Sequence, residues 1–217
     1  MNLQKILMAA GLLIFQLSLA ASVFAQDGGA SKEPPFSPEK VTPLPIGSRI
    51  PKLTFKTIEG ATFDLNEAIS GKPAILIFYR GGWCPFCNRH LSQLQKLEPE
   101  LIRMGYQILA VSPDLPEKLR PSIEKNKLSY TLLSDSKMAG AQAFGISFKV
   151  NDETVKRYKS MGIDLEKDSG ETHHLLPVPS AFVIGKDGII KFAYVNPDYK
   201  VRVDSEVLLT AAKAGLK

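Results

Sequence analysis

The sequence predicts an α/β fold in which helices cover both faces of a central mixed sheet. Residues 74–79 and 106–111 are continuous apolar runs, which are typical of strands buried on both faces. Residues 88–104 lie between these runs and repeat leucines at helical spacing. Near the end of the chain, two apolar strands flank a tight-turn sequence and precede an amphipathic helix. Alternating strands and helices followed by a hairpin imply a mixed sheet with two covered faces.

Residues 1–25 have the pattern of a secretory signal peptide with cleavage after Ala25. A short start with Lys5 precedes the apolar run 6–15, and small residues close the segment. An uncleaved membrane anchor is the alternative, because residues 6–25 are just long enough to span a bilayer, although polar residues interrupt them. We expect an exported, periplasmic protein that is not bound to the membrane after cleavage. Export places the thiols in an oxidising compartment.

Residues 26–45 are predicted to be a Pro-rich flexible tether, and residues 46–217 to be one domain. Six prolines fall between residues 26 and 51, among few apolar side chains, so this stretch buries too little surface to offset its ordering entropy. A proline-rich docking motif is the alternative. With 217 residues, 27 Lys and Arg against 22 Asp and Glu, and two cysteines, the chain is ordinary in composition. A Cys₄ zinc site and a disulfide-stapled mini-protein are excluded.

Within the domain, each element follows from a local pattern. Residues 53–58 and 62–65 flank Glu59-Gly60 as a hairpin. The tight turn Lys186-Asp187-Gly188 joins the two strands near the end of the chain. The other expected elements are a polar helix at 115–127, a strand at 130–133, a helix at 137–144, strands at 181–184 and 189–195, and a helix at 203–214.

The candidate chemistry lies where the first buried strand meets its helix. The text Arg80-Gly81-Gly82-Trp83-Cys84-Pro85-Phe86-Cys87 places a Cys-x-x-Cys at a helix start, which is a redox dithiol signature. The helix N-terminus favours a thiolate over a thiol, and Arg80 and Arg89 add positive charge. Cys87 continues the buried leucine stripe and should face inward, whereas Cys84 should be more exposed. A purely structural disulfide is the alternative, but so short a loop would add only about 2 kcal/mol.

These motifs resemble two known groups of proteins. Trp83-Cys84-Pro85-Phe86-Cys87 after an apolar strand is similar to the thioredoxin Trp-Cys-x-x-Cys. Residues 108–114, Leu132-Leu133-Ser134-Asp135 with the following Ala143-Phe144-Gly145-Ile146, and residues 181–192 resemble peroxiredoxins of the alkyl hydroperoxide reductase C/thiol-specific antioxidant type. The resemblance covers residues 46–214. It implies a thioredoxin-like fold with a peroxiredoxin-type N-terminal hairpin.

The chain departs from the peroxiredoxin pattern Pro-x-x-x-Thr/Ser-x-x-Cys at two groups that orient the peroxide. Arg80 stands at the proline, Cys84 replaces the Thr or Ser, and Cys87 falls on the peroxidatic cysteine. The activating arginine of that family falls on Pro179. Val178-Pro179 instead resembles the cis-proline loop of thioredoxins. The resemblance therefore implies that Arg80, Trp83, Pro85 and Pro179 tune the thiolate or position the substrate.

The two resemblances name different attacking sulfurs. The peroxiredoxin pattern makes Cys87 the sulfur that peroxide oxidises to a sulfenic acid, with Cys84 resolving it. The thioredoxin pattern and the expected burial make Cys84 the attacker, with Cys87 closing the disulfide. Both cycles pass through a Cys84–Cys87 disulfide.

Three histidines are the other candidates. His90, one turn after Cys87, is expected at the surface or in packing, or in a Cys-Cys-His metal site. His173 and His174 follow the charged insert 151–172, which we expect to be a solvated loop, with a lid over the dithiol as the alternative. A dithiol with a distal histidine also resembles copper-delivery proteins of thioredoxin fold, although their spacing is usually Cys-x₃-Cys. Lysine clusters mixed with acids and lacking aromatics favour solvated faces over nucleic-acid binding.

We therefore expect an exported dithiol oxidoreductase, an antioxidant thiol peroxidase that reduces peroxides with electrons from a thioredoxin-like protein or a small thiol. The first alternative is thiol–disulfide exchange on proteins, and the second is copper binding. The sequence contains no nucleotide, flavin or haem motif, so we expect no cofactor and no resident metal.

Overall fold

A computed structural model describes residues 33–216, and residues 34–216 belong to one compact unit. The expected signal peptide, residues 1–25, lies outside the described residues. The strands are β1 (Thr54–Lys56), β2 (Thr62–Asp64), β3 (Ala74–Phe78), β4 (Gln107–Ser112), β5 (Thr131–Ser134), β6 (Ser147–Lys149), β7 (Leu175–Pro177), β8 (Ser180–Ile184) and β9 (Ile190–Val195). The helices are η2 (Pro38–Lys40), α1 (Leu65–Gly71), α2 (Pro85–Arg103), α3 (Pro116–Asn126), α4 (Ala139–Ala143), α5 (Asp152–Ser160), α6 (Leu165–Ser169) and α7 (Ser205–Ala214).

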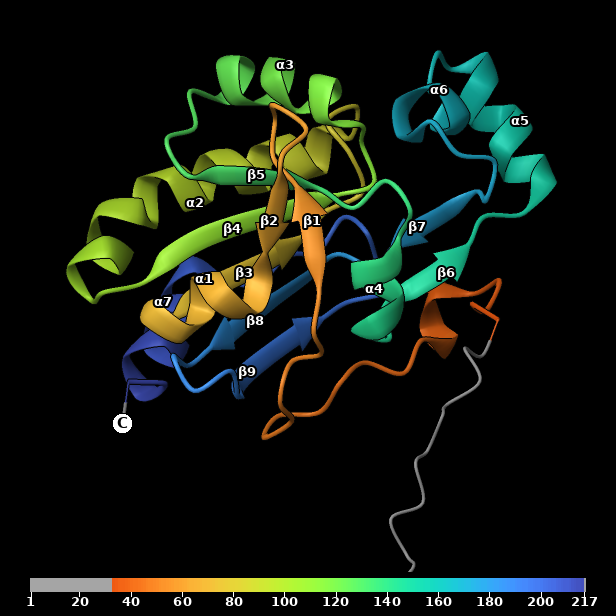
Figure 1. Cartoon of the computed structure of the whole chain (residues 1–217). Helices are drawn as coiled ribbons and strands as arrows, with labels where there is room; N and C mark the ends of the chain where they lie inside the picture. Colours follow the sequence, from red (N-terminus) through yellow and green to blue (C-terminus); the bar gives the residue numbers. More distant parts are fainter. Residues whose placement is uncertain (1–32, 217) are drawn as a thin grey trace, which may run out of the picture. The chain divides into compact units, whose positions relative to one another are not determined.

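Seven strands form one mixed sheet in the order β2-β1-β5-β4-β3-β8-β9 (Figure 1). β3, β4 and β5 are parallel, β8 and β9 are antiparallel to their neighbours, and β1 pairs antiparallel with both β2 and β5. The predicted mixed sheet and N-terminal hairpin are confirmed. A separate antiparallel pair, β6 and β7, adjoins the sheet and was not predicted.

The alternation of side chains along β3 builds two cores. Ile75, Ile77 and Tyr79 face the core formed with α2, α3 and α7, whereas Leu76 and Phe78 face the core formed with α1 and α4. Every residue of β3 is buried, as expected for a strand covered on both faces. The sheet is therefore a rigid base, and α2 is held against it along its leucine stripe.

The described part of the Pro-rich segment, residues 33–45, packs on the domain instead of standing away from it. The Lys149 N–H donates to the Pro35 carbonyl at 2.8 Å, and the Leu44 N–H donates to the Phe144 carbonyl at 3.1 Å. Leu44 also packs against the core that contains α1 and α4. These contacts offset the ordering entropy, so the structured domain begins before residue 46.

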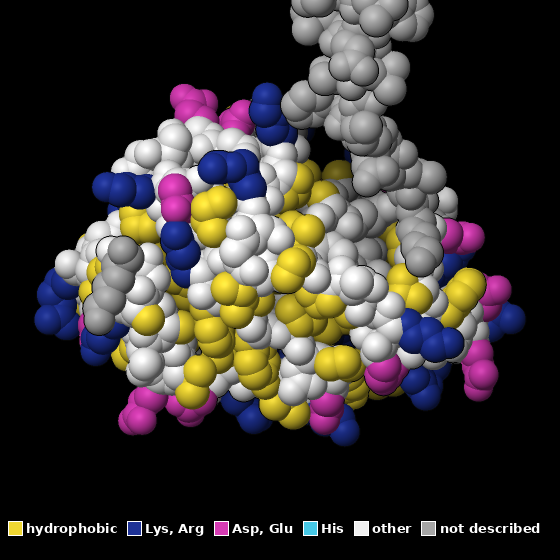
Figure 2. All heavy atoms as spheres, turned by 90° about the horizontal axis from the view of Figure 1, so that it is seen from below, with side chains coloured by type: hydrophobic (Ala, Val, Ile, Leu, Met, Phe, Trp, Pro, Cys, Tyr) yellow, Lys and Arg dark blue, Asp and Glu magenta, His cyan; other side chains and the backbone are white. Residues whose placement is uncertain are grey.

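The face seen in Figure 2 carries hydrophobic side chains near its middle. Lys, Arg, Asp and Glu side chains of both signs are distributed around its rim. Among the described residues, no helix is both long and apolar enough to cross a membrane.

Candidate active site

The two cysteines lie at the carboxyl end of β3, at the start of α2. β3 ends at Phe78, a glycine turn follows, and Pro85 occupies the first helical position with Cys84 as the N-cap. Proline is favoured there because its fixed φ suits a helix and its missing N–H would be unpaired anyway. The predicted strand–turn–helix setting of the dithiol is confirmed.

Two glycines allow the tight turn before the helix. Gly81 has φ +142°, a conformation that residues with a side chain rarely adopt. A Cβ on Gly82 would collide with Ser122 Oγ. The Gly82 N–H donates to Asp114 Oδ2 at 2.8 Å, and the Gly82 carbonyl accepts from Asn88 Nδ2 at 2.8 Å. The turn is thus fixed to β4 and to α2 at once.

Both thiols are reduced and buried. Cys84 is 1% exposed and Cys87 is 0% exposed, and both belong to the apolar core beneath α2. Cys87 faces inward as expected, but Cys84 is nearly as buried, because segments distant in sequence cover the start of the helix. Burial of both sulfurs restricts direct access from solvent to small molecules.

The two thiols have opposite acidities. A hydrogen bond from the Cys87 thiol is the main cause that lowers the pKa of Cys84 to about 6. Burial opposes this shift, while the Cys87 backbone N–H and the charges of Arg80 and Arg202 support it. Burial, followed by the hydrogen bond to Cys84 and its charge, raises the pKa of Cys87 well above its ordinary value. The negative charge of the reduced pair therefore resides on Cys84.

Arg80 is buried in an aromatic cage above the dithiol. Its guanidinium carbon lies 4.4 Å from the ring centroid of Tyr199, 4.9 Å from that of Trp83 and 5.6 Å from that of Tyr158. Arg80 Nη2 also donates to the Tyr158 hydroxyl. The side chain is only 4% exposed, so the cage holds one positive charge close to Cys84.

The insert 151–172 is not a solvated loop but forms the two helices α5 and α6 (Figure 1). Asn151 caps α5 by accepting from the Thr154 N–H, and Asp164 caps α6 by accepting from the Lys167 N–H. Tyr158 on α5 lies 5.7 Å from the Trp83 ring, between centroids. The insert therefore packs against the residues that precede Cys84, as the lid alternative requires.

A small cavity lies between α6 and the turn that precedes Cys84. It is lined by residues from four segments, including Arg80, Trp83, Asp114, Leu165 and His174. Its volume of about 10 Å³ is at the lower limit of what can hold one water molecule.

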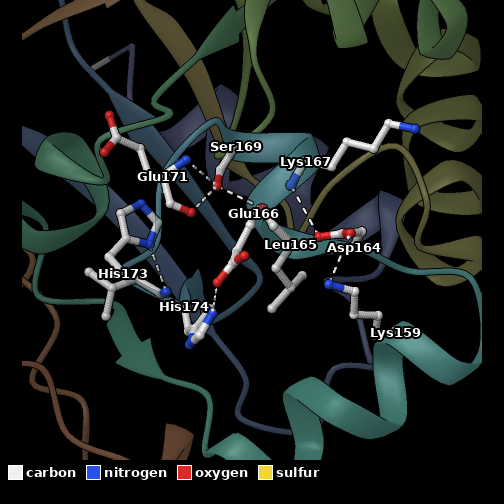
Figure 3. Close-up of polar contacts among 10 residues, drawn as sticks. Lys159, Asp164, Leu165, Glu166, Lys167, Ser169, Glu171, His173 and His174 are labelled. Carbon is white, nitrogen blue, oxygen red and sulfur yellow. Dashed lines mark hydrogen bonds and ion pairs between the residues drawn. The ribbon is translucent and has the colours of Figure 1, made fainter.

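His173 and His174 hold the base of the insert. The Leu175 N–H donates to His173 Nδ1 at 2.9 Å, so Nε2 carries the proton and donates to the Ser136 carbonyl at 2.8 Å. His174 Nε2 lies 2.8 Å from a carboxylate oxygen of Glu166 on α6 (Figure 3). Both rings have protein partners, and the described residues contain no cluster of three metal-ligating side chains. This geometry gives the copper hypothesis no support.

His90 is buried on α2, near Arg202. Burial, with a smaller effect from the charge of Arg202, lowers the pKa of His90 to about 3. The ring is therefore neutral at physiological pH. Its position fits the expectation of packing rather than that of a metal ligand.

The two prolines at the site have different surroundings. Pro85 is exposed at the first position of α2, and Pro179 is buried between β7 and β8. The Val178–Pro179 peptide bond is trans, as are all peptide bonds among residues 33–216, so the expected cis-proline loop is wrong. The Pro179 carbonyl accepts from the Asn196 N–H at 3.4 Å.

Three side chains around the dithiol were not predicted from the sequence. Asp114 is buried at the end of β4, where burial raises its pKa to about 7 despite hydrogen bonds from the Gly82 N–H and Ser112 Oγ. Arg202 Nη2 lies 3.3 Å from Cys87 Sγ. Tyr158 reaches Arg80 across 78 positions of sequence. A polar Asp at the end of a buried strand was the only one of these that carried a sequence signal.

Comparison with known proteins identifies relatives of most of the domain. A family model described as the AhpC/TSA family matches residues 46–193. The chain is 33% identical over 106 residues to a protein of Haemophilus influenzae named putative peroxiredoxin bcp, a match that covers 49% of this chain and 68% of that protein. It is 31% identical to peroxiredoxin Bcp of Escherichia coli K12, with 49% and 67% covered.

Solved structures share the fold at low sequence identity. The peroxidoxin BcpB of Mycobacterium tuberculosis superposes with a TM-score of 0.60 at 19% identity, covering 79% of this chain and 98% of that one. Reduced Prx3 of Vibrio vulnificus, solved in complex with hydrogen peroxide, gives 0.64 at 18% identity, with 78% and 96% covered. These similarities establish the α/β peroxiredoxin fold.

Proposed function

The chain belongs to the AhpC/TSA family of peroxiredoxins, which are thiol peroxidases, and we propose that it reduces peroxides through a Cys84–Cys87 disulfide with Cys84 as the attacking sulfur. The observation that carries this proposal is the charge distribution of the reduced pair. A thiolate is the nucleophile that attacks peroxide, and the low pKa of Cys84 makes it the thiolate near pH 7. Cys87 keeps its proton until Cys84 is oxidised.

The cycle balances with one peroxide and two thiol equivalents. The Cys84 thiolate attacks one oxygen of ROOH, the O–O bond breaks, and the alkoxide takes up a proton and leaves as ROH. Cys87, deprotonated, attacks the resulting sulfenic acid, the S–O bond breaks, water leaves and the disulfide forms. Two external thiol groups then return the pair to the dithiol and are themselves oxidised to a disulfide.

Burial favours peroxide over a protein disulfide as the oxidant. The sulfurs belong to residues that are 1% and 0% exposed, so a folded protein cannot reach them unless the cover of α5 and the loop around Tyr199 moves. Hydrogen peroxide is only slightly larger than water, so it needs a much smaller opening of this cover than a folded protein does. Exchange with protein disulfides remains the second candidate because of the Cys-x-x-Cys at the helix start and the acidic thiol.

Stopped-flow fluorescence of Trp83 tests the two functions. Trp83 is the single tryptophan of the chain and precedes Cys84, so oxidation of the pair should change its emission. We expect fast oxidation by hydrogen peroxide and slower oxidation by a protein disulfide. Steady-state turnover should be lost in both Cys84→Ser and Cys87→Ser. Peroxide oxidation no faster than that of a free thiol, or full turnover in either variant, would contradict the proposal.

We propose further that the protein is exported after cleavage behind Ala25 and receives its electrons from a thioredoxin-like protein or a small thiol. The pattern of residues 1–25 supports this proposal. Expression of the full chain in a bacterium tests it, with fractionation and N-terminal sequencing. We expect a periplasmic product that begins at Gln26, whereas a cytoplasmic product that retains residues 1–25 would refute export.

A further inference from the structure

Arg202 is fixed against the sulfur of Cys87 by contacts that involve both of its terminal nitrogens. Nη2 donates to Cys87 Sγ at 3.3 Å, and Nη1 donates to the carbonyls of Tyr199 and Val201 at 2.6 and 2.8 Å. Nε is buried and has no hydrogen-bond partner among residues 33–216. The guanidinium is therefore held in one place, between the loop that follows β9 and the first turn of α2.

In the reduced pair, Arg202 opposes stronger influences on Cys87. Burial, the hydrogen bond to Cys84 and the negative charge of Cys84 all raise the pKa of the Cys87 thiol, while Arg202 and the Arg80 backbone N–H lower it. Cys87 consequently remains protonated while Cys84 carries the charge. Arg202 also acts on Cys84, but it is the smallest of the influences on that thiol.

Oxidation of Cys84 reverses this balance. A sulfenic acid or a mixed disulfide on Cys84 has no negative charge, so the repulsion that holds the proton on Cys87 disappears. The guanidinium remains 3.3 Å from Cys87 Sγ and now faces the only sulfur of the pair that can carry a charge. A charge-assisted contact of this kind favours the thiolate form.

We propose that Arg202 is the catalytic residue of disulfide closure, where its guanidinium stabilises the Cys87 thiolate that attacks oxidised Cys84. In that step the S–S bond forms, the group on Cys84 leaves with the electron pair of its bond to sulfur, and the proton of Cys87 passes to solvent. In the reverse step, a reducing thiolate attacks Cys84, the S–S bond breaks, and Cys87 leaves as the thiolate beside Arg202. The inference rests on the proposed function only for the identity of the oxidant.

Apart from the arginines, none of the described titratable groups near this site offers the Cys87 thiolate a positive charge at neutral pH. Burial keeps Tyr79 and His90 neutral, since it raises the pKa of Tyr79 well above 10 and lowers that of His90 to about 3. Asp114, with its pKa near 7, titrates within the working range. Variants of Arg202 must therefore be compared with the wild type at each pH. The side chains that act directly on Cys87 are Cys84, Tyr79 and Arg202, while His90 lies near Arg202 and Asp114 acts on Tyr79.

Closure can be measured without peroxide by using 4,4′-dithiodipyridine on the reduced protein. Cys84 displaces one pyridinethione and forms a mixed disulfide, and the attack of Cys87 on Cys84 then releases the second. In Arg202→Gln we expect the first release to keep its rate within about threefold. The second release should slow at least tenfold at pH 7, with its pH midpoint raised by at least one unit, because one pKa unit is a factor of about ten. Arg202→Lys should recover part of both effects.

Lys200→Gln is the matched control, because it removes one exposed positive charge from the same loop, and it should leave both releases unchanged. A second release in Arg202→Gln with the rate and pH midpoint of the wild type would overturn the inference. Uniform slowing at every pH with an unshifted midpoint would also overturn it, since Arg202 would then act only by shaping the loop. Equal slowing of both releases would overturn it as well.

Hydrogen peroxide supplies a second and independent readout. After two equivalents of peroxide, the second of which can oxidise a sulfenic acid that has not been resolved, mass spectrometry should find disulfide in the wild type and additional sulfenic and sulfinic acid on Cys84 in Arg202→Gln. Identical products in both proteins would overturn the inference. If neither protein reacts with peroxide while the dithiodipyridine kinetics behave as expected, the proposed peroxidase function fails and the role of Arg202 in closure stands.

Discussion

Replacing Cys87 with alanine or serine tests the origin of the acidity of Cys84. A thiol with a pKa of about 6 is about 90% thiolate at pH 7, whereas one with an ordinary pKa near 9 is about 1% thiolate. The main cause of the shift is the hydrogen bond from the Cys87 thiol. A hydrogen bond to a charged group contributes roughly 1.5–3 kcal/mol, or about one to two pKa units. Cys87→Ala should therefore raise the pKa of Cys84 to about 7–8, while Cys87→Ser keeps a donor and should not.

Alkylation by iodoacetamide as a function of pH is the assay, because each variant has a single thiol and the reagent is small. At pH 6 we expect Cys87→Ala to react about tenfold more slowly than Cys87→Ser, with the two rates converging above pH 9. Circular dichroism of both variants controls for folding. Equal midpoints in the two variants would show that the Cys87 donor is not the cause. A midpoint near 9 in Cys87→Ser would refute the assignment of the thiolate to Cys84.

Three further substitutions probe the surroundings of the dithiol. Tyr158→Ala removes part of the cage around Arg80, so it should speed alkylation of the cysteines by a bulky maleimide several-fold more than alkylation by iodoacetamide. Tyr158→Phe keeps the ring and should react at rates close to those of the wild type. Equal acceleration of both reagents would contradict the role of α5 as a cover. Burial raises the pKa of Asp114 in the folded protein to about 7, so the neutral carboxyl stabilises the fold below pH 4 and this stability is lost as the pH rises through about 7. In urea unfolding, Asp114→Asn should stabilise the protein by up to about 4 kcal/mol at pH 8 and by much less at pH 4. A gain in stability that does not depend on pH would refute this. Gly82→Ala should cost about 1–3 kcal/mol of unfolding free energy through its collision with Ser122, and adding Ser122→Ala should recover much of that loss; no recovery would place the clash elsewhere.

Local patterns were sufficient for the elements that carry the cysteines. The apolar run of β3 and the leucine stripe of α2 are dictated by burial, and both features lie within residues 74–103. The hairpin between β8 and β9 was equally visible, because the sequence places a glycine in its turn. Gly188 does adopt the positive φ that such a turn requires, +74°. Sequence therefore predicted where the dithiol lies and that it begins a helix.

The environment of the dithiol could not be predicted in the same way, because it depends on contacts between distant segments. Tyr158 and Arg202 lie 78 and 115 positions from their partners Arg80 and Cys87, in segments whose charged composition favours solvent exposure. The helices α5 and α6 are short and rich in charge, so their apolar residues gave no clear period. These same contacts bury Cys84, which is why its exposure was misjudged.

The positions of the two arginines divide the cycle between the two sulfurs. Arg80, held by three aromatic rings, lies near the sulfur that is charged before oxidation, and Arg202 touches the sulfur that must be charged afterwards. Neither guanidinium has to move when the negative charge passes from Cys84 to Cys87. The aromatic cage that fixes Arg80 lies beside buried sulfurs, and a small peroxide needs a smaller opening to reach them than a protein does. A protein reductant must instead displace the cover, so the contacts of Tyr158 should govern the reductive step more strongly than the oxidative one.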